Sequence, residues 1–443
     1  MANILLFGAG KSASYLIRYF LERASEKSYL LTVCDPAANQ LKMHHPQEQL
    51  ICANHSIEEV EACLPLVEKA DVVISLLPAF LHEKVARLCL IAKRHLVTAS
   101  YVDAAMQSLH EEAKNAGLCF LNEAGLDPGI DHMSAMNIFE ELKSRGAVID
   151  SFLSYTGGLI APESDTNPWH YKLSWNPINV VLAGSGSSAR YKEEGELNFV
   201  TYPQMFQRIQ RFELEGYGAF EGYPNRDSLG YVQAYGLEQA RTVLRGTLRR
   251  PGYCSSWNAL VQLGLTDDSY QMTWPTETTG RKFLNAFLPY HPQKSLEDKI
   301  KDLDSVKLSH EDLERLEYLG LFSSDYLLPK TSGSPAQILQ AILEEKWRLE
   351  AQDRDLIVMI HQIGFTLEGK KGIMESSLAI EGEDARYTAM AKTVGLPAAM
   401  CAEEILHGNL PEYGVSIPIQ EKIYSPVLRN LSQRGITFQE KFS

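Results

Sequence analysis

Short apolar runs alternate with segments of helical periodicity through the first part of the chain. The apolar runs are Asn3–Phe7, Leu30–Cys34, Asp71–Leu77, His95–Ala99 and Leu118–Leu121. Amphipathic segments of helical length stand between them, among them Leu81–Ala92 and Asp103–Ala116. Continuous apolar runs are typical of strands that are buried on both faces, and strands that alternate with helices predict a doubly wound parallel sheet. We therefore expect an α/β domain over residues 1–124.

The pattern changes after residue 147. Strand-like runs predict a separate, mostly antiparallel sheet in an α+β domain; they are Val148–Tyr155, Asn198–Tyr202, Gly218–Tyr223 and Thr242–Arg249. Between residues 275 and 355, Leu, Glu, Lys and Asp recur at helical spacing, which predicts an all-helical insert. The runs Asp355–Leu367 and Ile373–Ile380 predict a hairpin that returns to the sheet. We expect this second domain at 125–389.

The C-terminal segment predicts two helices around a short strand. The helical patterns are Thr388–Gly408 and Ile419–Arg434, and the strand is Gly414–Ile417. A tail of this kind usually packs back on the first domain, so residues from about 390 to 443 are expected to complete it.

The segment Asn122–His132 joins the two halves of the chain. It follows the last apolar run, turns through two glycines and a proline, and continues as an amphipathic pattern from Asp131 to Arg145. An acid so placed, Asp127, lies at the carboxyl edge of the sheet, where open α/β sheets bind ligands. We expect an enzyme whose cofactor and substrate modules meet at this segment.

The turn after the first apolar run has the spacing of a dinucleotide-binding loop. Gly8, Gly10 and Ala13 match G-x-G-x-x-G/A, in which the glycines allow a tight turn and a close approach to a pyrophosphate. The small third residue lets the following helix pack on the strand. We expect cofactor contacts along the whole turn, at Gly8, Ala9, Gly10, Lys11, Ser12 and Ala13.

Asp35 ends the second apolar run, directly after Cys34. An acid about twenty residues beyond such glycines accepts hydrogen bonds from the ribose hydroxyls and repels a 2′-phosphate. Asp35 therefore predicts NAD rather than NADP as the cofactor. The alternative is a plain turn acid before Pro36.

Polar residues also follow the later strands of this domain. Ser75, Leu76, Leu77, Ser100 and Tyr101 stand at carboxyl strand ends and are expected beside the nicotinamide. For Tyr101, an ordinary aromatic position at the rim is an equal alternative.

Arginines concentrate at two places in the second domain. Arg226 stands in the turn Tyr223–Asp227, and strand alternation places Arg245, Thr247 and Arg249 on one face. Guanidinium groups bind carboxylates bidentately, so this set predicts a substrate with several carboxylates. The alternative for a single arginine is an ion pair within this acidic chain. Lys172 and Ser174 are weaker candidates.

Two histidines are candidates for a general base, because histidine titrates near neutral pH. They are His132 at a helix start and His361 inside an apolar strand. For a lone histidine in such positions, a structural role is the stronger interpretation. Cys/His clusters with metal-ligand spacing and the G-x-S-x-G elbow of hydrolases are absent from the sequence, so no metal is expected.

The composition of the chain limits the classes of partner and the compartment that we expect. With 42 Lys and Arg against 56 Asp and Glu, the net charge is -14, which argues against nucleic acid. No apolar run is long enough to span a membrane, and the N-terminus lacks the pattern of a secretion signal. The seven scattered cysteines form no CxxC, which predicts reduced thiols in a cytoplasmic protein.

Several ordered motifs carry a resemblance to a known family. They are Gly125–His132, Ser154–Gly158, Ala161–Ser164, Tyr171–Trp175, Tyr223–Ser228, Arg245–Arg249 and Thr388–Pro397. In these motifs the chain resembles the saccharopine dehydrogenase family of the L-glutamate-forming type. The likeness runs nearly end to end and is weakest in the helical insert.

The resemblance implies a Rossmann domain completed by the C-terminal tail, a substrate domain and a small all-helical domain. It also implies an oxidoreductase of lysine metabolism that reversibly converts saccharopine, NAD(P)⁺ and water to glutamate and aminoadipate semialdehyde. Saccharopine carries three carboxylates, in agreement with the arginines.

The resemblance also implies site residues, which we assign by motif position. The substrate contacts fall on Ser100, Tyr101, Asp127, Arg226, Thr247, Leu248 and Arg249, and the strand pattern adds Arg245 to them. The cofactor contacts fall on Ala9, Gly10, Lys11, Ser12, Cys34, Asp35, Leu77, Ala99, Ser100, Leu126, Asp127, Pro128 and Ser174.

One departure bears on the cofactor. Fungal members that synthesise lysine use NADP and lack an acid at the position of Asp35. The dehydrogenase half of the bifunctional lysine-degrading enzymes uses NAD and is more similar here. We expect NAD, with NADP as the alternative.

For catalysis, we expect Asp127 to bind the substrate amine and Tyr101 to act as a proton relay. One alternative is a sister carbon–nitrogen oxidoreductase such as carboxynorspermidine dehydrogenase, but a polyamine calls for acids rather than arginines. Another is a non-catalytic dinucleotide sensor, which has no reason to keep the motifs of the second domain. The expected partner is the small-molecule substrate, and a homodimer stays open.

Overall fold

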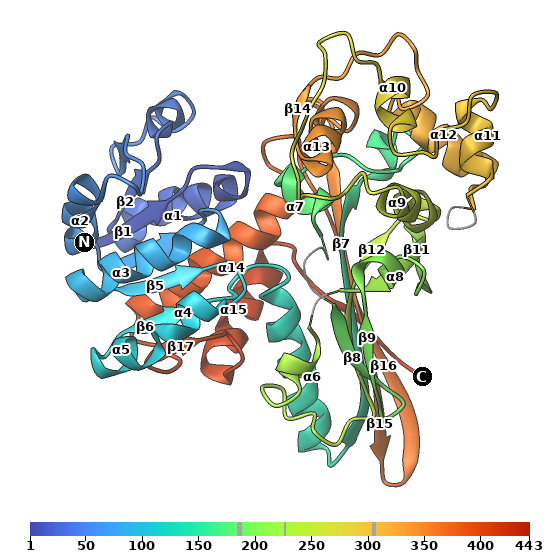
Figure 1. Cartoon of the computed structure of the whole chain (residues 1–443). Coiled ribbons are helices and arrows are strands. Elements are labelled where there is room, and N and C mark those ends of the chain that lie inside the picture. The colour runs from blue at the N-terminus through green and yellow to red at the C-terminus, as the bar shows by residue number, and fades with distance from the viewer. Residues whose placement is uncertain (184–187, 226, 304–306) are drawn as a thin grey trace. The chain divides into compact units, whose positions relative to one another are not determined.

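The computed structural model describes residues 1–183, 188–225, 227–303 and 307–443 (Figure 1). The chain forms two compact units, Met1–Val148 with Arg386–Gln439 and Ile149–Ala385 with Glu440–Ser443. Helix α6 (Ile130–Ser144) belongs to the first unit, whereas the sequence analysis sets the boundary before it. The reason is packing, because α6 lies against α15 (Glu421–Gln433) of the same unit.

The first unit is built on a seven-stranded sheet in the order β17-β6-β5-β4-β1-β2-β3, in which neighbouring strands run parallel. The strands are β1 (Ala2–Phe7), β2 (Tyr29–Cys34), β3 (Leu50–Ala53), β4 (Val72–Ser75), β5 (His95–Thr98), β6 (Cys119–Leu121) and β17 (Gly414–Ser416). The predicted doubly wound sheet is confirmed. Its order reverses at β1, and such a switch point is where open α/β sheets bind ligands.

Helices connect these strands, and one of them departs from the prediction. The connecting helices are α1 (Ser14–Lys27), α2 (Val60–Lys69), α3 (His82–Ala92), α4 (Ala104–Ser108) and α5 (His110–Asn115). The single helix expected over Asp103–Ala116 is two helices. The Ser108 hydroxyl donates to the Ala105 carbonyl, and the Leu109 N–H turns to the Met106 carbonyl instead (3.0 Å), which tightens the turn and breaks the helical ladder.

The C-terminal tail belongs to the first unit up to Gln439, whereas the last residues, Glu440–Ser443, belong to the second. Strand β17 pairs with β6, and α14 (Ala389–Leu406) packs against α1. The carboxylate of Glu403 in α14 is buried and accepts hydrogen bonds from the Tyr29 hydroxyl (2.8 Å) and from Arg23 Nε (3.1 Å). The Tyr19 hydroxyl donates to the same carboxylate. The tail is therefore tied to α1 and β2 by a buried charge as well as by apolar packing.

The second unit contains a nine-stranded sheet in the order β10-β11-β12-β7-β15-β16-β18, in which β8 also pairs with β12 and β9 pairs with β8. Its strands are β7 (Val148–Ile160), β8 (Ala189–Glu193), β9 (Glu196–Val200), β10 (Gln210–Leu214), β11 (Gly218–Pro224), β12 (Thr242–Arg249), β15 (Asp355–Leu367), β16 (Lys370–Glu381) and β18 (Gln439–Phe442). Strands β7 and β12 run parallel, so the sheet is mixed. Strands β8, β10 and β18 were not predicted because they are short and partly polar, and β3 of the first unit was not predicted because it has only four residues.

Helices cover the second unit. They are α7 (Pro177–Val181), α8 (Tyr202–Met205), α9 (Tyr253–Gln262), α10 (Gly280–Asn285), α11 (Leu296–Lys301), α12 (His310–Tyr318) and α13 (Pro335–Lys346), and the short strands β13 (Met272–Thr273) and β14 (Ser332–Gly333) pair beside them. Figure 1 shows α10, α11 and α12 grouped at one end of the sheet. Among the described residues, no helix combines the length and apolarity needed to cross a bilayer.

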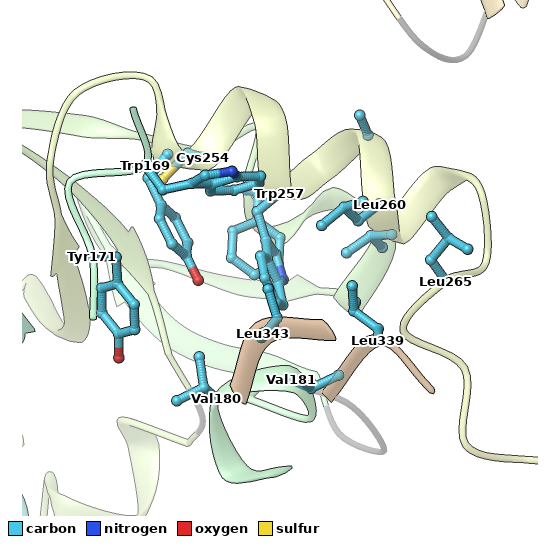
Figure 2. Close-up of a cluster of buried hydrophobic side chains, with 14 of the residues drawn as sticks. Trp169, Tyr171, Val180, Val181, Cys254, Trp257, Leu260, Leu265, Leu339 and Leu343 are labelled. Carbon is cyan, nitrogen blue, oxygen red and sulfur yellow. The ribbon is translucent and has the colours of Figure 1, made fainter. Parts of the chain in front are cut away.

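An aromatic core holds the helices of the second unit to its sheet. Figure 2 shows Trp169, Tyr171 and Trp257 in one cluster with Leu339 and Leu343 of α13, and Trp257 lies next to Leu343. The ring centroids of Trp169 and Trp257 lie 6.2 Å apart in an edge-on arrangement. Large buried rings of this kind dominate the energetics of a core.

Candidate active site

The turn after β1 has the shape that a dinucleotide requires. Gly8 adopts φ +96°, and a Cβ there would lie 3.1 Å from the Leu76 carbonyl oxygen. At Gly10 a Cβ would meet nothing within 4 Å. Ala13 is buried, at the end of the 3₁₀ turn Lys11–Ala13 that leads into α1. The loop is therefore tight at Gly8 and open at Gly10, which fits a pyrophosphate approaching the backbone at the second glycine.

Asp35 lies next to this loop. Its carboxylate accepts the N–H of Ala9 (2.9 Å) and the N–H of Ala37 (2.8 Å). Two backbone donors fix the carboxylate and its negative charge at the glycine turn. Cys34, the residue before it, is buried, and this burial raises the pKa of its thiol to about 12. Cys34 therefore stays a neutral thiol at physiological pH.

A buried histidine links the carboxyl ends of β4 and β5. His82 opens α3, and its Nδ1 lies 2.8 Å from the Ser75 hydroxyl while its Nε2 lies 2.8 Å from the Ser100 hydroxyl. Burial lowers the pKa of His82 to about 4, against an opposing effect of the Asp103 charge. The sequence analysis identified Ser75 and Ser100 but missed His82. The signal that indicates His82 in the sequence is its position at the start of the helix that follows β4.

Tyr101 and Asp127 meet at the same edge of the sheet. The Tyr101 hydroxyl donates to Asp127 Oδ1 at 2.7 Å. Asp127 is joined to Pro128 by a cis peptide, and Leu126 before it is buried. Two loops far apart in the sequence thus bring a phenol and a carboxylate together, a combination that can bind an amine and move a proton.

Ala99 lies next to Gly125, since a Cβ built on Gly125 would lie 3.1 Å from the Ala99 Cβ.

A second, fully buried network braces this pair. Glu123 Oε1 accepts the Val102 N–H (3.0 Å), and its Oε2 lies 2.7 Å from His132 Nε2. Asp131 accepts the Gly129 N–H at 2.6 Å. His132 has no exposed surface, so it holds the turn rather than acting as a base on a bound ligand. His361 is equally buried, in β15 beside the Phe152 ring.

The arginines of β12 lie in the second unit. Arg245 stacks on the Tyr231 ring at 4.4 Å, and Arg249 lies 5.1 Å from the Tyr171 ring. Between them, the Thr247 hydroxyl accepts a hydrogen bond from Asn225 (2.9 Å). Leu248 points into the core and is fully buried.

Arg249 is the more informative of the two arginines. It is 3% exposed, and its Nε has no hydrogen-bond partner among the residues that the structure describes. Its Nη1 donates to the Leu248 carbonyl (2.9 Å). A buried guanidinium N–H without an acceptor is costly, and a bound carboxylate would remove that cost.

The other predicted residues of the second unit are placed as follows. Arg226 lies outside the described residues. Its neighbour Asp227 forms an ion pair with Arg190. Lys172 is paired with Asp353 at 2.7 Å, so its charge is already neutralised within the unit. Ser174 is buried.

Comparison with known proteins identifies the family. The model described as "Saccharopine dehydrogenase C-terminal domain" matches residues 125–436, and the one described as "Saccharopine dehydrogenase NADP binding domain" matches residues 4–121. The chain belongs to the saccharopine dehydrogenase family. The resemblance found in the sequence motifs is thereby confirmed.

Individual relatives of the family agree. The saccharopine dehydrogenase [NADP(+), L-glutamate-forming] of Pyricularia oryzae is 33% identical over 462 residues, which cover 99% of this chain and 98% of that protein. The mitochondrial alpha-aminoadipic semialdehyde synthase of Rattus norvegicus is 35% identical over 446 residues, 98% of this chain but 47% of that protein. The chain thus spans about half the length of this second relative.

Among solved structures, the apo L-Glu-forming saccharopine dehydrogenase of Saccharomyces cerevisiae matches the fold. Its TM-score is 0.87 at 31% sequence identity, with 100% of both chains covered. The predicted fold class, a Rossmann-type parallel sheet with an α+β domain, is that of the saccharopine dehydrogenase family.

Proposed function

We propose that this member of the saccharopine dehydrogenase family is an NAD-preferring oxidoreductase that reversibly converts saccharopine and water to L-glutamate and aminoadipate semialdehyde. The observation that carries the proposal is the Tyr101–Asp127 hydrogen bond at 2.7 Å, in the unit that holds the dinucleotide loop. The bound cofactor supplies the hydride acceptor. Every other step needs groups that hold a polyanion, bind an amine and transfer protons.

The chemistry of the substrate sets the roles of the residues. The secondary amine of saccharopine must be neutral before the carbon that becomes the aldehyde can lose a hydride. Water then adds to the resulting imine, and the carbon–nitrogen bond breaks to release glutamate. Asp127 binds the amine and takes its proton, and the Tyr101 hydroxyl relays protons to and from the reacting nitrogen.

Cationic groups of the second unit suit the carboxylates of saccharopine. The buried Nε of Arg249 favours a carboxylate ligand, and Arg245 and Thr247 share its strand face. The Lys172–Asp353 ion pair makes Lys172 a weaker candidate for this role. A polyamine substrate would be repelled by the same arginines.

The cofactor preference rests on Asp35. Its fixed carboxylate suits ribose hydroxyls and repels a 2′-phosphate, which supports NAD. The family model and the Pyricularia relative carry NADP in their names, so the preference proposed here is a difference within the family.

We also propose a cytoplasmic location, which the seven free cysteines support through the reducing compartment that they favour.

The test is the initial rate of saccharopine oxidation by the full chain, with NAD and with NADP, followed at the nicotinamide absorbance. Turnover with a higher kcat/KM for NAD supports both parts of the proposal. A higher value for NADP keeps the reaction and overturns the role of Asp35. No turnover with either cofactor, in folded protein that still binds NADH, overturns the proposed reaction.

A further inference from the structure

We propose that His82 is a positioning residue that fixes the direction of the Ser100 hydroxyl toward the reacting groups. The inference rests on the proposed function, in which Ser100 contacts the substrate and the cofactor. His82 itself matches no motif that the sequence analysis used.

The two ends of the imidazole define a directed chain of hydrogen bonds. His82 Nδ1 lies 2.8 Å from the Ser75 hydroxyl, and Nε2 lies 2.8 Å from the Ser100 hydroxyl. A neutral imidazole has one N–H donor and one lone pair, so it donates to one serine and accepts from the other. The tautomer of His82 therefore decides whether Ser100 offers a proton or a lone pair to a ligand.

The neutral state of the ring is built into the fold. His82 is 5% exposed, and burial lowers the pKa of its imidazole to about 4. The charged group that opposes this shift is Asp103, the capping residue of α4. At neutral pH the ring is uncharged, so the imidazole keeps one N–H donor and one acceptor nitrogen.

The row of hydrogen bonds through His82 ends inside the protein. It therefore positions a hydroxyl group and does not conduct protons to solvent. Ser75 has no exposed surface, so a proton passed to it would go no further toward solvent. Ser100, at the other end, is half-buried and lies directly before Tyr101. Only the Ser100 end can meet a ligand.

The backbone of Ser100 does not depend on His82. The Ser100 carbonyl accepts the Glu123 N–H (3.1 Å), and the Thr98 carbonyl accepts the Ala124 N–H (3.0 Å). Removing the imidazole should therefore leave the Ser100 backbone in place and release only its hydroxyl. This separation makes the role testable by substitution.

Two amide substitutions distinguish the two hydrogen bonds of the imidazole. The side-chain amide of asparagine takes the position of Nδ1, and that of glutamine takes the position of Nε2. His82→Gln keeps a partner for Ser100, whereas His82→Asn keeps only the partner for Ser75. We expect kcat/KM for saccharopine to fall about tenfold in His82→Asn, the effect of one hydrogen bond, and less than threefold in His82→Gln. Equal losses in the two variants would overturn the proposal.

A double-mutant cycle with Ser100→Ala tests the same link. If His82 acts through Ser100, the variant with both His82→Asn and Ser100→Ala loses no more than Ser100→Ala alone. Multiplied losses would mean that His82 acts elsewhere. The matched control is His95→Asn, since Nδ1 of His95 accepts the Cys119 N–H (3.0 Å) in the same sheet, outside the site.

A spectroscopic readout keeps this inference separate from the proposed reaction. In the full chain labelled with ¹⁵N-histidine, the His82 signals are identified by their loss in His82→Gln. They should show one neutral tautomer from pH 6 to 9, and Ser100→Ala should change the tautomer balance. A charged or tautomer-averaged His82 in wild-type protein would overturn the proposal even if saccharopine is oxidised. A fixed tautomer without turnover would leave this geometry intact and overturn the reaction.

Discussion

The Tyr101 hydroxyl donates to Asp127 Oδ1 at 2.7 Å, across a gap of 26 positions in the sequence. Both residues follow strand ends of the parallel sheet, Tyr101 after β5 and Asp127 after β6. The buried Glu123 holds the backbone next to Tyr101, and Asp131 holds the backbone next to Pro128. The pair is therefore set in a rigid frame before any ligand arrives.

Removal of the Asp127 carboxylate tests the catalytic pair. We expect Asp127→Ala to lower kcat/KM for saccharopine by about 100-fold, the usual scale of a lost acid–base group, and Tyr101→Phe to lower it by about tenfold. NADH affinity, measured by fluorescence, serves to show that the dinucleotide site survives. The control is Asp71→Asn, an exposed acid at the start of β4. An unchanged kcat/KM in Asp127→Ala would remove Asp127 from the mechanism.

Replacement of Asp35 should change the cofactor preference. Placing like charges together costs several kcal/mol, so Asp35→Ser should raise the ratio of kcat/KM for NADP to that for NAD by about 100-fold. The loss of its bond from the Ala9 N–H should also weaken NAD binding. Rates with both cofactors, measured under the same conditions, give the ratio. An unchanged ratio would show that Asp35 does not discriminate between a hydroxyl and a phosphate at the 2′ position of the ribose.

Arg249 should act on substrate binding. Lysine lacks the guanidinium fork, so Arg249→Lys should raise KM for saccharopine by about tenfold while the dissociation constant of NADH stays unchanged. Arg190→Lys, an exposed arginine paired with Asp227, is the matched control. If KM moves equally in both variants, the effect does not come from a carboxylate bound to Arg249.

The stability of the protein should fall in acid through His82. Its folded pKa of about 4 lies below the unfolded value of 6.5, so protonation of the ring lowers the stability of the folded state. The neutral His82 ring contributes about 3 kcal/mol to the free energy of unfolding. This contribution is fully present above about pH 6.5 and is lost as the pH falls toward 4. Urea unfolding from pH 7 to 4 should show a shallower loss in His82→Gln than in wild type.

Glu403 should stabilise the docked tail. Its carboxylate is 2% exposed and faces three donors, so Glu403→Ala leaves Arg23 without its buried partner. Breaking a buried pair costs about 3 kcal/mol or more, which urea unfolding at pH 7 can measure. Glu22→Ala removes the exposed pair with Arg434 (3.3 Å) and should cost less than about 1 kcal/mol. Equal losses would mean that the buried charge adds nothing.

By itself, the sequence determined most of the strands, the glycine turn and the acid that follows β2. These features are local, because a buried parallel strand needs a continuous apolar run and a tight turn needs glycine. The predicted hairpin over Asp355–Leu367 and Ile373–Ile380 is present as β15 and β16. Short, partly exposed strands such as β10 carry too little of this signal, and the predicted helix over Asp103–Ala116 is divided near Ser108, whose hydroxyl donates to the Ala105 carbonyl.

Only the tertiary structure decided which polar groups meet. His82 finds Ser75 seven positions away and Ser100 eighteen positions away, and Glu403 finds Tyr19 across 384 positions. The fold also pairs Lys172 with Asp353, a partner that the sequence does not indicate. Hydrogen bonds and ion pairs act over a few ångströms, so the partner of a side chain depends on how strands and helices are assembled. Sequence periodicity specifies those elements without specifying which of their ends lie together.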